Sequence, residues 1–126
     1  MRMTLLATAI AIGAMAAPAG HQEGAANPRV IHIVAERFTF TPSTITVDQG
    51  TSVELRISSD DTDHGFKITG LGDVDVEIPK RGRGEVTVTF EAKEPGTYPF
   101  ECSRVCGAGH GFMRGAVRVR PRPEGK

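Results

Sequence analysis

The stretch Val53-Glu54-Leu55-Arg56-Ile57 decides the fold class, because apolar and charged residues alternate in it one by one. A period of two places successive side chains on opposite faces of an extended strand. The segment is therefore predicted to be a strand with one buried face and one solvated face. The same alternation recurs over residues 86–90 and 117–120, which indicates a protein built from sheets.

The composition agrees with this pattern. From Gly20 onward the chain contains 11 Val, 6 Ile and 10 Thr against 2 Leu. β-branched residues suit a pleated surface better than a helix. No amphipathic helix and no internal repeat is found. Further predicted strands are 30–35, 44–47, 65–68, 74–78 and 97–102, separated by turn signals at 48–50, 58–63, 80–84 and 94–96. Short strands at this spacing predict an all-β antiparallel sandwich or barrel.

The 126 residues are enough for one domain. An early positive charge, an uncharged apolar run and then small residues are typical of a secretory signal peptide. The run is shorter than the ~20 apolar residues that span a membrane. We therefore predict a signal peptide at 1–19, a folded domain at 28–120 and a loose tail at 121–126. The protein would be periplasmic or otherwise exported, or membrane-anchored if the first segment is not cleaved.

The charge balance excludes several classes of function. Lys and Arg total 15 and Asp and Glu total 15, so the formal net charge is zero. Nucleic-acid binding needs a clustered positive excess, which argues against that partner. The chain has no P-loop, GxSxG or GxGxxG motif, so the common nucleotide-binding and hydrolase interpretations have no support.

The segment 102–113 carries the chemistry of the chain, in the pattern C-x3-C-x3-H-x2-M. It contains both cysteines and the one methionine beyond the N-terminal segment. Thiolate, imidazole and thioether groups together select copper, zinc or an iron–sulfur cluster. The thioether favours copper, because zinc sites use Cys, His and carboxylate ligands. The pattern therefore predicts a copper site on a loop between two strands, held by Cys102, Cys106, His110 and Met113.

One further ligand is expected from a distant part of the sequence. His64 lies between a polar turn and a short predicted strand, and a sandwich can bring that turn beside the 102–113 loop. Taken alone, His64 would be a turn or surface histidine, and Met113 would be core filler. The alternative for Cys102 and Cys106 is a disulfide, since the compartment is oxidising. A disulfide leaves the spacing of the histidine and the methionine unexplained.

Other polar residues receive simpler interpretations. His32 lies inside a predicted strand and is expected to be structural. His21 lies near the new N-terminus, where a terminal amine and an imidazole can bind copper adventitiously. The acidic cluster Asp60, Asp61 and Asp63 is expected to be a solvated turn, with a docking patch for a basic partner as the alternative.

The pattern C-S-x-x-C-G-x-G-H-x-x-M, with an upstream H-G-F at 64–66, resembles the dinuclear copper (CuA) domain of cytochrome c oxidase subunit II. It is most similar to that of the B-type oxidases, and nitrous oxide reductase carries the same kind of domain. Segments 38–50 and 94–98 resemble cupredoxins in general. The resemblance covers residues 30–120. It implies a cupredoxin-like Greek-key β-sandwich or barrel, antiparallel with mixed pairing at the edges.

The resemblance also implies the ligand set of two copper ions: His64, Cys102, Arg104, Cys106, His110 and Met113. The cysteine sulfurs would bridge the ions, and each histidine would bind one of them. The methionine and the backbone carbonyl of Arg104 would be weak ligands, with Arg104 standing where the family usually has Glu. No open coordination position is implied, so no small-molecule substrate is expected at the metal.

The leading functional hypothesis is a monomeric electron-transfer protein with a mixed-valence dinuclear centre. It would pass single electrons between a c-type cytochrome and a terminal oxidase or reductase. Bridging thiolates on a rigid frame keep rearrangement small, which favours a carrier over a catalyst. Two alternatives remain open: a periplasmic copper-handling or delivery protein, and a separate cytochrome c oxidase subunit II-like component of an oxidoreductase complex. A mononuclear cupredoxin site would need only one cysteine.

Overall fold

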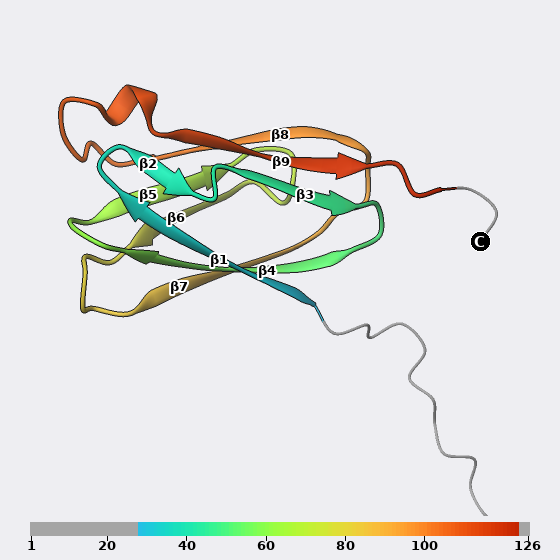
Figure 1. Ribbon diagram of the computed structural model, residues 1–126, viewed down its shortest axis with the longest axis horizontal. Helices are drawn as coiled ribbons and strands as arrows, with labels where there is room; N and C mark the ends of the chain where they lie inside the picture. Colours follow the sequence, from blue (N-terminus) through green and yellow to red (C-terminus); the bar gives the residue numbers. More distant parts are fainter. Residues whose placement is uncertain (1–27, 124–126) are drawn as a thin grey trace, which may run out of the picture.

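A computed structural model of the chain describes residues 28–123, which form nine strands and one 3-10 helix. The strands build two sheets that pack face to face, so the predicted all-β sandwich is confirmed (Figure 1). In chain order the elements are β1 (Arg29–Glu36), β2 (Thr39–Thr41), β3 (Thr44–Asp48), β4 (Ser52–Ser59), β5 (His64–Ile68), β6 (Val74–Ile78), β7 (Glu85–Glu91), β8 (Gly96–Glu101), η1 (His110–Phe112) and β9 (Arg114–Arg120).

Several expectations concern the two ends of the chain. The signal peptide at 1–19 and His21 lie outside the described residues, as does the end of the predicted tail. Within residues 28–123 there is no helix long and apolar enough to cross a membrane.

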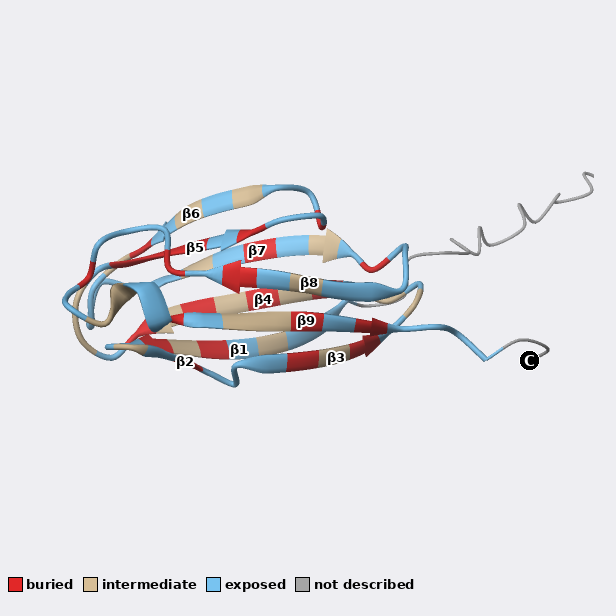
Figure 2. Ribbon diagram, turned by 90° about the horizontal axis from the view of Figure 1, so that it is seen from above, coloured by how far each residue is buried: buried red, intermediate tan, exposed pale blue. Residues whose placement is uncertain are grey.

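Strand β4 shows why the alternating sequence folds in this way. Val53, Leu55 and Ile57 are fully buried, while the side chains between them are only partly covered. The inner faces of both sheets carry such buried positions and meet in one core (Figure 2). Burial of this apolar surface is the main stabilising contribution to the fold.

The two sheets have the strand orders β2-β1-β4-β7 and β3-β9-β8-β5-β6. Most neighbours are antiparallel, but β1 pairs with β4 in parallel, and β3 pairs with β9 in parallel. The expected mixed pairing is therefore present. The β3–β9 pair lies at a sheet edge, whereas the β1–β4 pair lies inside its sheet.

All eight strands predicted from the sequence are found, and the ninth is β2. It has three residues, of which only Phe40 is buried, so it is too short to show a period of two. Phe40 nevertheless matters, because its ring packs edge-on against Phe66 and Phe100, with centroids 5.9 and 5.3 Å away. Aromatic pairs of this kind contribute about 0.5–1.5 kcal/mol each beyond their burial.

This aromatic cluster leads directly to one end of the sandwich. Phe66 and Phe100 lie two residues from His64 and Cys102, and all four side chains are buried. The 102–113 loop lies at this end, together with the β1–β2 and β4–β5 connections (Figure 1). Segments far apart in the sequence therefore meet around the loop.

Candidate metal centre

The backbone of the 102–113 loop is closed at its base. The Cys102 N–H donates to the carbonyl of Met113 at 3.0 Å, which joins the end of β8 to the start of β9. Within the loop, His110 donates to Gly107 and Met113 donates to His110, both at 3.2 Å, which forms the turn of η1. This turn holds the histidine and the methionine on the same side as the cysteines.

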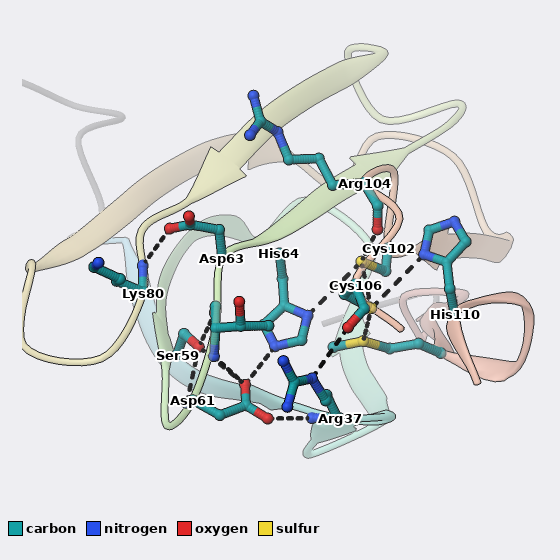
Figure 3. Close-up of polar contacts among 12 residues, drawn as sticks. Arg37, Ser59, Asp61, Asp63, His64, Lys80, Cys102, Arg104, Cys106 and His110 are labelled. Carbon is teal, nitrogen blue, oxygen red and sulfur yellow. Dashed lines mark hydrogen bonds and ion pairs between the residues drawn. The ribbon is translucent and has the colours of Figure 1, made fainter. Parts of the chain in front are cut away.

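Figure 3 shows the two cysteine sulfurs at the centre of the site, with Sγ atoms 3.6 Å apart. The sulfur of Cys102 lies 3.9 Å from Nδ1 of His64 and 3.1 Å from the carbonyl oxygen of Arg104. The sulfur of Cys106 lies 3.7 Å from Nδ1 of His110 and 3.8 Å from Sδ of Met113. Each sulfur is thus flanked by one imidazole nitrogen and one weaker donor.

His64 enters the site from β5 with its side chain fully buried. Its Nε2 lies 2.6 Å from Oδ1 of Asp61, which fixes the ring with Nδ1 directed toward Cys102. An Nε2–H that donates to a carboxylate leaves the lone pair on Nδ1, the form that a metal ligand needs.

The carboxylate of Asp61 is itself held in place. It accepts hydrogen bonds from the backbone N–H groups of Arg37 and Thr62, at 2.9 and 2.7 Å. Burial raises its pKa, but these two bonds and the His64 ring outweigh burial and lower the pKa to about 2. The sequence-based interpretation of a solvated acidic turn is therefore wrong for Asp61.

The β1–β2 connection supports the second half of the loop. Nε of Arg37 donates to the carbonyl of Cys106 at 3.1 Å. The ring of Phe38 lies against Gly107 and Gly109, so closely that a Cβ on Gly109 would overlap it. Arg37 therefore links the Asp61–His64 pair to the cysteine loop.

The donor set fits copper. Two thiols, two imidazoles, a thioether and a carbonyl converge, and soft sulfur with imidazole is the combination that copper prefers. Burial, reinforced by the neighbouring Cys102, raises the pKa of the Cys106 thiol to about 11, so without metal this thiol carries its proton at neutral pH. Both cysteines are free rather than disulfide-bonded in this structure.

The six predicted site residues all come together, from the β5 start and from the loop. Among the described residues, His64, Cys102 and Cys106 form a buried group whose ligand atoms lie within 4.8 Å of one another. His32 is exposed on β1 and takes no part. Sequence reasoning missed Arg37 and Phe38, because no local motif marks residues that support a loop so distant in the chain.

One side of the site faces the solvent. His110 is half-buried, whereas His64 is fully buried. Phe112 and Val105, on the same loop, have exposed fractions of 85% and 88%. The site therefore has a buried histidine at one end and an accessible histidine beside exposed apolar side chains at the other.

Comparison with known proteins identifies relatives of this arrangement. A family model described as cupredoxin-like domain matches residues 4–117. Subunit 2 of cytochrome c oxidase from Thermus thermophilus is 36% identical over 95 residues, which cover 75% of this chain and 67% of the relative. A second subunit 2 sequence, from another record of the same species, has the same identity, and 54% of its length is covered. The chain thus spans about half to two thirds of these relatives.

A solved structure shows the same fold. The periplasmic domain of cytochrome oxidase subunit II from Bradyrhizobium japonicum superposes with a TM-score of 0.65 at 19% identity, covering 74% of this chain and 84% of that one. The family match and the subunit 2 homology include the segment that brings the six residues together. The chain belongs to the family of cupredoxin-like domains and is homologous to the periplasmic domain of cytochrome c oxidase subunit II.

Proposed function

We propose that this chain is an electron-transfer protein whose loop and β5 hold two copper ions. The observation that carries the proposal is the matched surroundings of the two sulfurs. Cys102 and Cys106 lie 3.6 Å apart, and each has one imidazole Nδ1 and one weak donor beside it. A mononuclear site would leave one of these sets without a purpose. The ligands would be His64, Cys102, Arg104, Cys106, His110 and Met113.

When bound, the copper pair would supply reversible one-electron chemistry. The residues of this chain contribute a rigid frame for it. Asp61 fixes the ring of His64, Arg37 fixes the carbonyl of Cys106, and the 3-10 turn fixes His110 and Met113. A site whose ligands are held before the electron arrives needs little rearrangement when the charge changes.

The exposed side of the site is the proposed point of electron exchange. The imidazole of His110 reaches the surface, and the apolar side chains of Val105 and Phe112 flank it on the same loop. Apolar contact around an accessible ligand suits a transient partner that must dock and leave. We propose a c-type cytochrome on one side of the transfer and a terminal oxidase or reductase on the other, in the periplasm or another exported location.

The deciding experiment uses the domain without residues 1–19, loaded with copper. We expect two coppers per chain and an EPR spectrum with hyperfine splitting from two equivalent nuclei. Cys106→Ser should lose this spectrum, while Ser52→Ala, an exposed strand position, should retain it. One copper with single-nucleus splitting would contradict the dinuclear site. Colourless, labile Cu(I) would instead favour a copper-delivery protein.

A further inference from the structure

We propose that edge strand β6 positions the first half of the metal loop through Asp75 and Glu77. These two side chains set where the carbonyl of Arg104 lies against the sulfur of Cys102. The inference rests on the proposed function in one respect, namely that this carbonyl is a copper ligand. Asp75 and Glu77 touch neither sulfur, so they are positioning residues.

The two halves of the loop are held in different ways. Residues 107–113 support themselves through the backbone hydrogen bonds of the 3-10 turn. The segment Ser103–Val105 makes no backbone–backbone hydrogen bond to the described residues. Its three side chains are exposed, and Val105 is 88% exposed. Something other than the backbone or the core must therefore fix the carbonyl of Arg104.

The side chains of this segment are fixed by β6. The hydroxyl of Ser103 donates to Oδ1 of Asp75 at 2.6 Å, a short bond to a charged acceptor. The guanidinium of Arg104 pairs with Glu77, with Nη2 2.8 Å from Oε2. These two ion-pair side chains are 53% and 49% exposed, and one exposed ion pair contributes little to stability. Two adjacent contacts on two adjacent loop residues restrain the segment more strongly than either alone.

The geometry of β5 and β6 makes the contact possible. Asp75 and Glu77 are two residues apart, so they lie on the same face of β6. Glu77 is paired with Gly65 across the strands, and Asp75 is paired with Lys67. Because position 65 has no side chain, the loop can lie directly on β5 there. A Cβ at Gly65 would come within 2.9 Å of the Arg104 nitrogen and 3.0 Å of the Ser103 nitrogen.

The consequence falls on a single oxygen atom. The Arg104 carbonyl lies 3.1 Å from Sγ of Cys102, and Gly65 donates its N–H to the same sulfur at 3.5 Å. If residues 103–104 move away from β6, this oxygen moves with them, whereas His64 and Met113 keep their own supports. Loosening β6 contacts should therefore alter one weak donor while leaving the other five in place.

The first test uses the reduced, metal-free protein and does not depend on copper. The variant Asp75→Ala/Glu77→Ala removes both contacts, and Glu85→Ala removes an exposed carboxylate at the start of β7 as the matched control. We expect NMR order parameters of Arg104 and Val105 amides to fall from rigid values of about 0.85 to below about 0.6. The Glu85→Ala protein should keep the values of the unmodified chain.

The second test uses the copper-loaded protein. In the double alanine variant, we expect copper loss to a chelator to become about three- to tenfold faster, from the loss of one ion pair and one charge-assisted bond. The charge-reversed pair Glu77→Arg/Arg104→Glu restores an ion pair, so it should release copper more slowly than either single reversal. A purely additive result would overturn the positioning role.

The outcomes separate this inference from the proposed function. If the unmodified protein does not bind two coppers, the proposed function fails, and the order parameters still decide whether β6 holds the loop. If two coppers bind and the double alanine variant matches Glu85→Ala in order parameters and copper release, the role of β6 is wrong. Unchanged unfolding midpoints across the variants would show that the sandwich itself is intact.

Discussion

The imidazole of His64 and the carboxylate of Asp61 form a buried hydrogen bond of 2.6 Å between Nε2 and Oδ1. The ring is fully buried, so this bond satisfies the one ring nitrogen that faces away from the sulfurs. The same carboxylate accepts the N–H of Arg37, whose Nε reaches the Cys106 carbonyl. One acidic side chain therefore links the buried histidine to the opposite half of the loop.

Truncation of this carboxylate should weaken both the fold and the metal site. In Asp61→Ala, the His64 ring and two backbone N–H groups lose their acceptor, which should cost about 1–3 kcal/mol of unfolding free energy. Loss of a partner that orients a metal-ligating histidine typically costs about 10–100-fold in metal affinity. Urea unfolding of the metal-free protein and competition with a chelator measure the two effects. Asp60→Ala, an exposed neighbour, is the control, and equal behaviour of the two variants would refute the role of Asp61.

Replacement of the buried thioether should separate potential from stability. Met113 is fully buried, and Met113→Leu conserves its volume, so the unfolding free energy should fall by less than about 1.5 kcal/mol. Both coppers should remain bound, because the sulfurs and imidazoles are unchanged. Loss of a donor beside Cys106 favours the less positively charged, reduced state, so the reduction potential should rise.

Protein-film voltammetry and copper analysis of the Met113→Leu protein check this prediction together. Val117→Leu, a buried substitution on β9 outside the site, is the control for general core effects. A lowered or unchanged potential with full copper content would remove Met113 from the ligand set.

The exposed apolar side chains of the loop should matter for the partner and not for the fold. Phe112→Ser/Val105→Ser changes two side chains that are 85% and 88% exposed, and such surface changes usually alter stability by no more than about 0.5 kcal/mol each. Copper content and potential should stay the same. Stopped-flow oxidation of a c-type cytochrome should become slower, because the apolar contact around His110 is lost.

The matched control for docking is Val30→Ser, which removes an exposed valine from the start of β1, at the end of the sandwich away from the loop (Figure 1). It should leave the rate unchanged. If all three serine substitutions slow the reaction equally, the partner does not dock at His110.

The sequence allowed much of this site to be predicted, for reasons that can be named. The cysteines, His110 and Met113 lie within twelve positions, so their convergence requires only a tight loop, and His64 was placed by the strand that follows it. Asp61 was misassigned because a turn aspartate has the same local pattern whether it is solvated or paired with a buried ring. Arg37 acts on Cys106 from 69 residues away, and only the assembled sheets bring the two together.

The close packing of β5 against the loop makes a final prediction about one methyl group. In Gly65→Ala, the new Cβ would overlap the Ser103 side chain and press on two backbone nitrogens of the loop. Because backbone atoms cannot move as a side-chain end can, the loop must shift, at a cost of about 1–3 kcal/mol. Thermal unfolding should show this loss, and chelator competition should show weaker copper binding. Gly111→Ala adds the same methyl group to the same loop where nothing lies within 4 Å, so it should change neither quantity. Equal effects of the two substitutions would mean that the loop does not rest on β5.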